Sequence, residues 1–441
     1  MTADASLPAL AADAALERAT MARVTRRFGP VLFACFVVAF LDRVNIGFAA
    51  LTMNADLGLS STAFGLGAGL FFLTYFLLEV PSNLALERFG ARAWIARIML
   101  TWGLVSGTTA FVRGEWSFYL VRLLLGAAEA GFFPGVIYFL TLWFPVRYRA
   151  RIVAIFLAAV PIASVVGSPI SGLLMQLDGA AGLKGWQWMF LIEAIPALAL
   201  TPIVLARLSD APAGAAWLGA DERDWLERRL RDEARAAAAP RHAQRALDLI
   251  RSPIILELGA AYFGLTGVNY GLSFFLPQIV RSFGLTILQT GFVAAVPFAL
   301  ATGGMMWWGR RSDVTGERRF HVLLPFGLAA GGLAASTLPA PPVVQLAWLS
   351  VAAFGVYAAF PVYWTVPPPL LDRANAAAGI ALINSIGNLS GFASPYAVGA
   401  IKDATGGFSG GLRLIAAVGA VSWLILARLT RAAPPRGSGG D

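Results

Sequence analysis

The sequence predicts an all-helical membrane protein whose twelve spans form two halves of six. Three observations support this fold class. The 441 residues are 58% hydrophobic and only 13% charged, and the mean hydropathy is +0.69. Soluble globular chains carry about 25% charged residues, because a folded surface must be largely polar to stay dissolved. The third observation is that most of the remaining charges lie in short loops, tails and one central segment, 208–252.

Each span needs about 20 predominantly apolar residues. The twelve predicted spans are 28–50, 63–86, 93–112, 116–141, 151–177, 187–207, 253–279, 287–309, 320–338, 342–365, 374–400 and 408–428. Only the proline-rich stretch 338–342 separates the ninth span from the tenth. The first six spans predict an N-terminal bundle, 28–207, and the last six predict a C-terminal bundle, 253–428.

The segments outside the bundles are predicted to lie in the cytoplasm. They are an N-terminal tail (1–27), a linker (208–252) and a C-terminal tail (429–441). Arginines concentrate in alternate loops, with Arg147 and Arg149 as one example, and the positive-inside rule places such loops in the cytoplasm. An even number of spans agrees with two cytoplasmic termini. Trp225, Leu226 and Leu230 have helical spacing, so the linker is expected to contain an amphipathic helix.

The residue counts also exclude several classes of function. A single cysteine, Cys35, excludes a disulfide framework, and two histidines exclude a histidine-rich metal site. The chain lacks the H-E-x-x-H and Walker motifs. The net charge of +9 would suggest nucleic acid in a soluble protein, but here membrane topology explains it. We therefore expect neither an enzyme nor a nucleic-acid partner, and no metal or cofactor.

An internal repeat divides the chain into related halves. Glu87 lies in the turn after the second span, and Asp313 lies in the corresponding turn after the eighth. In each turn the acid is followed three residues later by glycine and then by arginine. Two six-span halves with a repeated turn are typical of secondary transporters.

Five stretches together resemble the major facilitator superfamily and, within it, the anion:cation symporter family. They are 41–47, 81–84 with 87–92, 185–193, Arg122 with 129–135, and 384–388. The resemblance covers nearly the whole chain and extends to bacterial carriers of tartrate, sugar acids, phthalate and hydroxyphenylacetate. It implies the major facilitator fold. The usual superfamily turn has glycine and aspartate where this chain has Asn83 and Glu87, a variant that is normal in the subfamily.

Four ionisable residues within spans are the main site candidates, because each costs about 2.5–3.5 kcal/mol to insert and needs a partner or a function. Asp42 and Arg43 are adjacent in the first span, so both can flank a cavity. Arg122 and Glu129 are seven residues apart, which places them on one helix face about 10 Å apart. We expect both to face the same space. The resemblance implies proton coupling by Asp42 and Glu129 and substrate binding by Arg43 and Arg122. Mutual charge compensation is the alternative for each pair.

Uncharged residues are expected to complete the substrate site. The resemblance places Tyr75, Trp364, Asn384 and Asn388 around the substrate. The two asparagines are four residues apart and share a helix face. The alternatives are hydrogen bonds between helices for the asparagines and ordinary core packing for the aromatic residues.

Other charged residues are assigned structural roles. Glu79 and Glu193 lie near span ends and are expected to brace helix ends and gates; contact with the substrate is the alternative. The resemblance implies that charged residues at the cytosolic turns latch the two halves together: Glu87, Arg88, Arg92, Asp313, Arg318 and Arg319.

The sequence thus predicts a secondary transporter in a bacterial inner membrane. It would import a small organic anion by symport with H⁺ in preference to Na⁺, through alternating access. The expected cargo is a tartrate-like hydroxy-dicarboxylate, a sugar acid or an aromatic carboxylate. A monomer within the lipid bilayer is expected. The alternative is a proton-antiport efflux pump for drugs or metabolites.

Overall fold

The computed structural model describes residues 7–237, 249, 251–371 and 376–432, and these residues contain no β-strand. Apart from short 3-10 turns, the helices are α1 (Leu7–Leu57), α2 (Ser61–Phe89), α3 (Ala91–Thr108), α4 (Glu115–Glu129), α5 (Phe132–Trp143), α6 (Val146–Leu174), α7 (Gly185–Arg207), α8 (Ala220–Ala237), α10 (Pro253–Arg281), α11 (Ile287–Thr315), α12 (Arg319–Ala335), α13 (Pro342–Tyr363), α14 (Ala376–Asn388), α15 (Ser390–Thr405) and α16 (Ser409–Ala432). The predicted all-helical fold class is confirmed.

Within the described residues, every predicted span overlaps one helix or two consecutive helices. Residues 374 and 375 of the eleventh predicted span lie outside the described residues. Eight helical stretches of the described chain are long and apolar enough to cross a membrane by length and composition. The other four spans are shorter or more polar, and they correspond to α3, α10, α12 and the pair α14–α15.

Two spans expected to be continuous are divided. Span 116–141 breaks between α4 and α5 at Ala130 and Gly131, and span 374–400 breaks between α14 and α15 at Leu389. At the first break Gly131 adopts a left-handed conformation, with φ of 83°. A Cβ atom there would also lie 2.4 Å from the Oγ atom of Ser82. Glycine is therefore required on both conformational and steric grounds.

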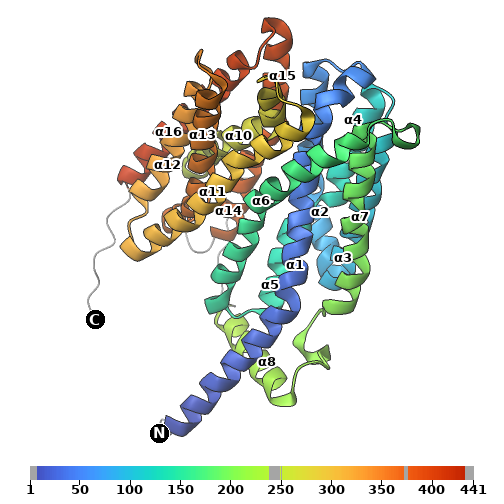
Figure 1. The fold of residues 1–441 in the computed structure, drawn as a ribbon. Helices are drawn as coiled ribbons and strands as arrows, with labels where there is room; N and C mark the ends of the chain where they lie inside the picture. The colour runs from blue at the N-terminus through green and yellow to red at the C-terminus, as the bar shows by residue number, and fades with distance from the viewer. Residues whose placement is uncertain (1–6, 238–248, 250, 372–375, 433–441) are drawn as a thin grey trace.

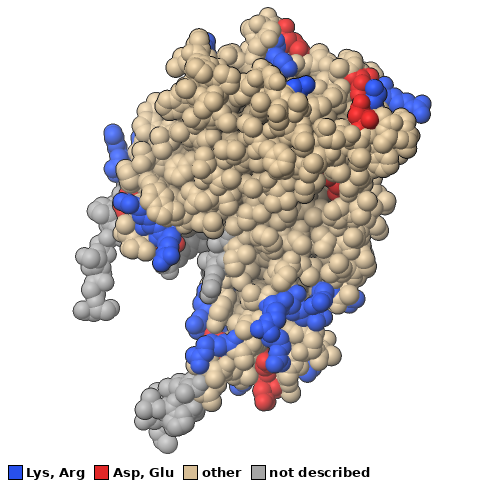
Figure 2. Space-filling model, in the orientation of Figure 1, with Lys and Arg blue, Asp and Glu red and all other residues tan. Residues whose placement is uncertain are grey.

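The helices form two bundles, α1–α7 and α10–α16, which lie beside each other (Figure 1). Between the bundles, α2 packs against α15, α6 against α11, and α1 against α10. We call the end where α1 stops and α2 begins the far end, and the opposite end the α8 end. Charged side chains gather toward these two ends of the face shown in Figure 2, which leaves a broad and largely uncharged band between them.

The far end is where the α2–α15 contact is tightest. A Cβ atom on Gly65 would lie 2.2 Å from the carbonyl oxygen of Pro395, and one on Gly399 would lie 2.1 Å from that of Ser61. Asp403, near the end of α15, accepts hydrogen bonds from the backbone N–H groups of Ser61 (3.0 Å) and Thr62 (2.7 Å). It also accepts one from the Thr62 hydroxyl group. An acidic group at a helix N-terminus satisfies free N–H groups and complements the helix dipole.

At the α8 end, the N-terminal tail and the linker pack together. The tail is helical from residue 7 and continues into the first span as α1. Arg23 of α1 pairs with Glu222 of α8 at 2.5 Å, and Trp225 and Leu226 of α8 are buried. The linker thus contains the amphipathic helix that the sequence predicts.

Candidate functional site

A cavity that is partly open to solvent lies between the two bundles. Helices α1, α2, α4, α5 and α6 line it from one side, and α10, α11, α13 and α14 line it from the other. Six of the sequence-predicted site residues line this cavity: Arg43, Tyr75, Glu129, Trp364, Asn384 and Asn388. The structure therefore brings together residues from the first, second, fourth, tenth and eleventh spans.

Arg43 and Glu129 form an ion pair in the cavity wall. The Nε atom of Arg43 donates to Oε1 of Glu129 at 3.1 Å, and its Nη2 atom donates to the same oxygen. The side chain of Glu129 is fully buried, whereas that of Arg43 is 18% exposed. The guanidinium group thus remains accessible to a ligand while it neutralises a buried carboxylate.

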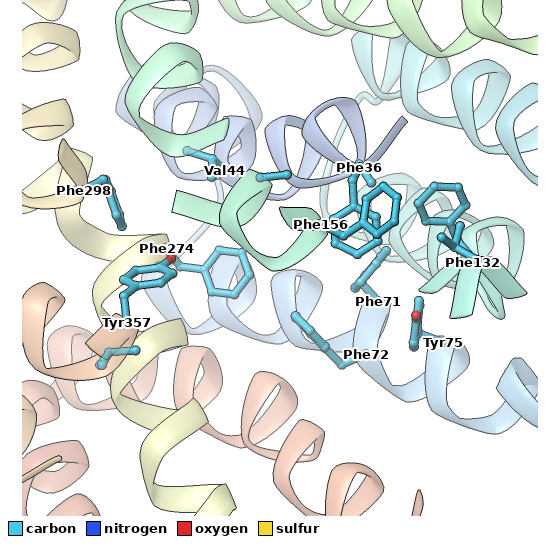
Figure 3. Packing of buried hydrophobic residues seen from close by; sticks show 14 of the residues in the cluster. Phe36, Val44, Phe71, Phe72, Tyr75, Phe132, Phe156, Phe274, Phe298 and Tyr357 are labelled. Carbon is cyan, nitrogen blue, oxygen red and sulfur yellow. The ribbon is translucent and has the colours of Figure 1, made fainter. Parts of the chain in front are cut away.

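Aromatic rings surround the Arg43 guanidinium group. Its Cζ atom lies 4.9 Å from the ring centre of Phe40, 5.4 Å from Phe71 and 5.3 Å from Tyr75. Figure 3 shows that Phe71, Phe72 and Tyr75 lie close together along α2. Aromatic faces attract cations and limit access of water, so they hold the guanidinium group in place and strengthen its electrostatic interactions.

The break between α4 and α5 sets the position of Glu129. This residue is the last of α4, directly before the non-helical Ala130. A negative charge at a helix C-terminus is unfavourable because the helix dipole is negative there. Glu129 therefore depends on Arg43 for compensation of its charge.

Asp42 points away from the cavity. Its carboxylate oxygens accept hydrogen bonds from Nε1 of Trp102 at 2.7 Å, from Nδ2 of Asn45 at 3.1 Å, and from the hydroxyl group of Ser106. These contacts tie α1 to α3 inside the N-terminal bundle. Asp42 and Arg43 are neighbours in the sequence, but they face different surroundings because adjacent helical residues point about 100° apart.

Arg122 is also absent from the cavity wall. It is 3% exposed, and its guanidinium group lies near the backbone carbonyl oxygens of Gly67 (3.4 Å) and Ala68 (3.5 Å) in α2. The expectation that Arg122 and Glu129 face one space is therefore not met. Helix α2 packs across the part of α4 that carries Arg122, so only Glu129 reaches the cavity.

Glu79 is a cavity residue that sequence reasoning missed. It was expected to brace a span end, but it lines the cavity together with Tyr75 from the same helix. Residues 72, 75 and 79 follow the spacing of one helix face. That spacing is the feature of the sequence that places Glu79 on the same face as Tyr75.

The described residues that form the wall from the second bundle carry no charge, and they combine aromatic and polar side chains. They include Thr266, Asn269 and Tyr270 of α10, none of which was assigned to the site. Residues 262, 266 and 270 again share a helix face. All three charged side chains of the described wall, Arg43, Glu79 and Glu129, come from the first bundle.

The predicted gate residues make contacts within their own halves. Arg318 pairs with Asp313 at 2.7 Å, and the backbone N–H group of Arg92 donates to Asp210. Arg88 stacks on the neighbouring ring of Phe89, while Glu87 and Arg319 are exposed. Among the described residues, the contacts found for this set do not link the two bundles.

The family model described as "Major Facilitator Superfamily" matches residues 32–395. An Agrobacterium vitis protein named "Putative tartrate transporter" is 51% identical over 423 residues, covering 96% of this chain and 97% of that protein. An Acinetobacter baumannii protein named "Quinolone resistance transporter" is 41% identical over 403 residues, covering 91% of this chain and 93% of that protein.

A solved structure of a D-xylose-proton symporter has a TM-score of 0.74 at 14% identity. The match covers 91% of this chain and 97% of that one, and at this identity it supports the fold alone. The resemblance inferred from the sequence motifs is confirmed at the level of the superfamily. The chain belongs to the Major Facilitator Superfamily, and it is a multi-pass membrane transporter rather than an enzyme.

Proposed function

We propose that this transporter imports a small organic anion together with a proton. The observation that carries the proposal is the Arg43–Glu129 pair, which lies in the wall of the cavity between the bundles. An arginine is suited to a carboxylate because its planar group donates two parallel hydrogen bonds. The relatives named as tartrate transporters support the same class of cargo.

The pair couples the anion to the proton by competition. When Glu129 is ionised it occupies the guanidinium group of Arg43. When Glu129 takes up a proton, Arg43 is released and binds the carboxylate of the substrate. Loss of the proton restores the internal pair and displaces the anion. Binding of the proton therefore favours binding of the anion, and binding of the anion favours binding of the proton.

The uncharged wall contacts the rest of the substrate. Asn384, Asn388 and Trp364 offer amide and indole groups on the side of the cavity opposite Arg43. Such groups bind hydroxyl groups and a second carboxylate without adding a second buried cation. A hydroxy-dicarboxylate such as tartrate, a sugar acid or an aromatic carboxylate meets these requirements.

Alternating access follows from the two-bundle design. The bundles 28–207 and 253–428 would rock about the cavity, as in other transporters built from two repeats. This arrangement is that of an inward-facing state. At the far end α2 contacts α15, whereas at the α8 end the gate residues do not link the two halves. In this state the α8 end faces the cytoplasm of a bacterial cell, both termini are cytoplasmic, and the inner membrane holds a monomer.

Transport into proteoliposomes tests the proposal. Purified protein would be reconstituted and offered labelled tartrate, a sugar acid or an aromatic carboxylate, with and without an inside-alkaline proton gradient. At least one anion should accumulate, and the gradient should increase its accumulation; protein-free liposomes give the background. If none of the anions accumulates, or if accumulation is the same with and without the gradient, the proposal is contradicted.

A second candidate function is drug export by proton antiport. The relative named as a quinolone resistance transporter and the aromatic cavity wall favour it. A cell that overproduces the protein would then survive higher quinolone concentrations than a cell producing Glu129→Gln. Unchanged susceptibility in both cells would exclude this candidate.

A further inference from the structure

Arg97 of α3 is a charged residue within a span, and neither the cavity nor the gate residues account for it. It lies six residues after the start of α3, which is about 9 Å along the helix axis from the α8 end of that helix. Its side chain is partly exposed. A charged side chain at this depth is costly, so it needs a partner or a function.

The guanidinium group of Arg97 is not paired with another side chain of the described residues. Its Nε atom is buried and has no hydrogen-bond acceptor among them, and none of their carboxylates is close enough to form an ion pair with it. An arginine carries five N–H donors and no acceptor. The terminal nitrogens of Arg97 can therefore donate to an anion from outside the protein.

Aromatic rings fix the direction of the Arg97 side chain. Its Cζ atom lies 4.0 Å from the ring centre of Trp94, one turn earlier in α3, so the side chain extends toward the α8 end. The Trp94 ring donates a hydrogen bond to the Oγ atom of Ser82 in α2 at 3.0 Å. It also stacks on Phe89, with the ring centres 5.6 Å apart. Phe89 is exposed, and exposed aromatic rings gather where the membrane core meets the lipid headgroups.

The face of α3 that carries Arg97 continues as an apolar surface. Leu100 and Leu104 follow Arg97 at intervals of three and four residues, so the three side chains lie on one side of the helix. Leu100 is 42% exposed and Leu104 is 54% exposed, whereas Trp102 and Ser106 on the other side are buried. Within a bilayer, exposed leucines at this depth contact acyl chains. A cation at headgroup level next to exposed leucines matches the two parts of a phospholipid.

The turn from α2 to α3 has an excess of positive charge. It contains one acid and three arginines: Glu87, Arg88, Arg92 and Arg97. The nearby Asp210 is bonded to the backbone N–H group of Arg92, and the arginines still outnumber the acids when Asp210 is counted. A zwitterionic headgroup would bring its own cation among these arginines, whereas an anionic headgroup would not. The charge of the turn therefore favours an anionic lipid.

The second half of the chain has no arginine at the equivalent place. Gly90 of the first repeated turn corresponds to Gly316 of the second, and Arg92 corresponds to Arg318. Counted in the same way, the counterpart of Arg97 is Leu323. The same helical turn thus forms with an apolar residue at this position, so the fold of the repeat does not by itself require an arginine.

We propose that Arg97 binds the phosphate group of an anionic phospholipid from the leaflet at the α8 end. The planar guanidinium group donates two parallel hydrogen bonds to phosphate oxygens, and one acyl chain lies along the two exposed leucines of α3. Arg88 lies 5.5 Å from the ring centre of Phe89, beyond the stack of Phe89 on Trp94, and adds to the attraction for the headgroup. Arg97 does not line the cavity, so this lipid site does not depend on the proposed transport cycle.

Native mass spectrometry of the full-length protein in detergent tests the proposal. Delipidated protein would be titrated with phosphatidylglycerol, which is anionic, and with phosphatidylcholine, which has the same phosphodiester group but no net charge. The wild type should bind phosphatidylglycerol more tightly. Arg97→Gln should weaken that binding about tenfold, as expected for the loss of a charge-assisted hydrogen bond. Equal affinity for the two lipids, or equal binding of phosphatidylglycerol by wild type and Arg97→Gln, would overturn the proposal.

Arg318→Gln is the matched control. It removes one arginine from the same end of the protein, at the counterpart of Arg92, where Arg318 already pairs with Asp313 at 2.7 Å. This variant should bind phosphatidylglycerol as the wild type does. A loss equal to that of Arg97→Gln would show that the lipid responds to the overall charge of the α8 end, and this result would contradict a site at Arg97.

A second variant covers the case in which Arg97→Gln does not fold. Arg88 is exposed at the end of α2, so Arg88→Gln is expected to fold. It should weaken phosphatidylglycerol binding about fivefold, the usual contribution of an arginine near a membrane surface. Unchanged binding in this variant would contradict the proposed headgroup site. Glycerol phosphate, which lacks acyl chains, should not displace the lipid at equal concentration; displacement would contradict a lipid as the occupant.

Discussion

Arg43 of α1 and Glu129 of α4 are paired across the N-terminal bundle, with Nε of the arginine 3.1 Å from Oε1 of the glutamate. The pair joins the first span to the broken fourth span. Both residues line the cavity, but only the side chain of Arg43 is accessible to solvent. In this arrangement a single guanidinium group can bind either an internal carboxylate or the carboxylate of a ligand.

The first prediction concerns anion recognition. Arg43→Lys keeps the positive charge but replaces the planar two-donor group with a single ammonium group. Loss of one charge-assisted hydrogen bond costs about 1.5–3 kcal/mol, so substrate affinity should fall roughly 10- to 100-fold. Calorimetric titration of the purified protein with the transported anion measures the change.

Arg122→Lys is the matched control for this experiment. Arg122 is buried near α2 carbonyl oxygens and does not line the cavity. This variant should leave substrate affinity within about twofold of wild type, a difference of about 0.4 kcal/mol, even if it lowers thermal stability. Equal losses of affinity in both lysine variants would show that Arg43 has no special role in anion binding.

The second prediction concerns the Asp403 contact with α2 at the far end. Burial alone would raise the pKa of Asp403, but hydrogen bonds from Thr62 and Ser61 outweigh burial and lower the pKa to about 2. Because this pKa is depressed by folding, the stabilisation is present above the unfolded pKa of about 3.9. It is lost only as the pH falls toward 2. The contact should therefore be intact across the physiological pH range.

Asp403→Asn should weaken the closed far end by about 1 kcal/mol, the typical value of a helix cap. Spin labels at positions 113 and 281, both exposed in the structure, would report a larger population with the far end open. Asp178→Asn is the control, because Asp178 accepts its hydrogen bond from Gly185 within one bundle. An unchanged distance distribution in Asp403→Asn would show that the contact of Asp403 with α2 does not hold the far end closed.

The third prediction concerns close packing of α2 against α15. Gly65→Ala would place a Cβ atom 2.2 Å from the Pro395 carbonyl oxygen. Overpacking of this kind costs about 1–3 kcal/mol, so the far end should open and the protein should favour the opposite conformation. The same spin-label pair measures the shift.

Gly303→Ala separates this steric effect from the ordinary stabilisation of a helix by alanine. A Cβ atom on Gly303 would meet nothing within 4 Å, so this variant should leave the distance distribution unchanged. A shift of equal size in both variants would mean that the α2–α15 contact does not control the far end.

The fold was predictable from the sequence because burial in lipid requires long apolar helices, and these are directly visible as hydrophobic segments. The pairing of charged residues was less predictable. Spacing placed Arg122 and Glu129 on one face of one span. It could not show that α4 ends at Glu129, or that α2 packs over Arg122.

The adjacent residues Asp42 and Arg43 illustrate the same limit. Their sequence positions allow them to flank a cavity, but the packing of α3 decides which side is interior. Trp102 and Ser106 draw Asp42 into the bundle, and Arg43 is left to face the cavity. Glu79 could have been found by extending the helical spacing from Tyr75, which lies one turn earlier on the same face of α2.

The central claim is that Glu129 either binds a proton or pairs with Arg43, and that proton binding releases Arg43 for the anion. Glu129→Gln mimics the protonated acid, so the variant should bind the anion and exchange labelled for unlabelled anion across proteoliposomes. It should fail to accumulate the anion when an inside-alkaline gradient is imposed, because it cannot carry the proton. Retained exchange with lost accumulation is the result that the account predicts; gradient-driven accumulation equal to that of wild type would contradict it.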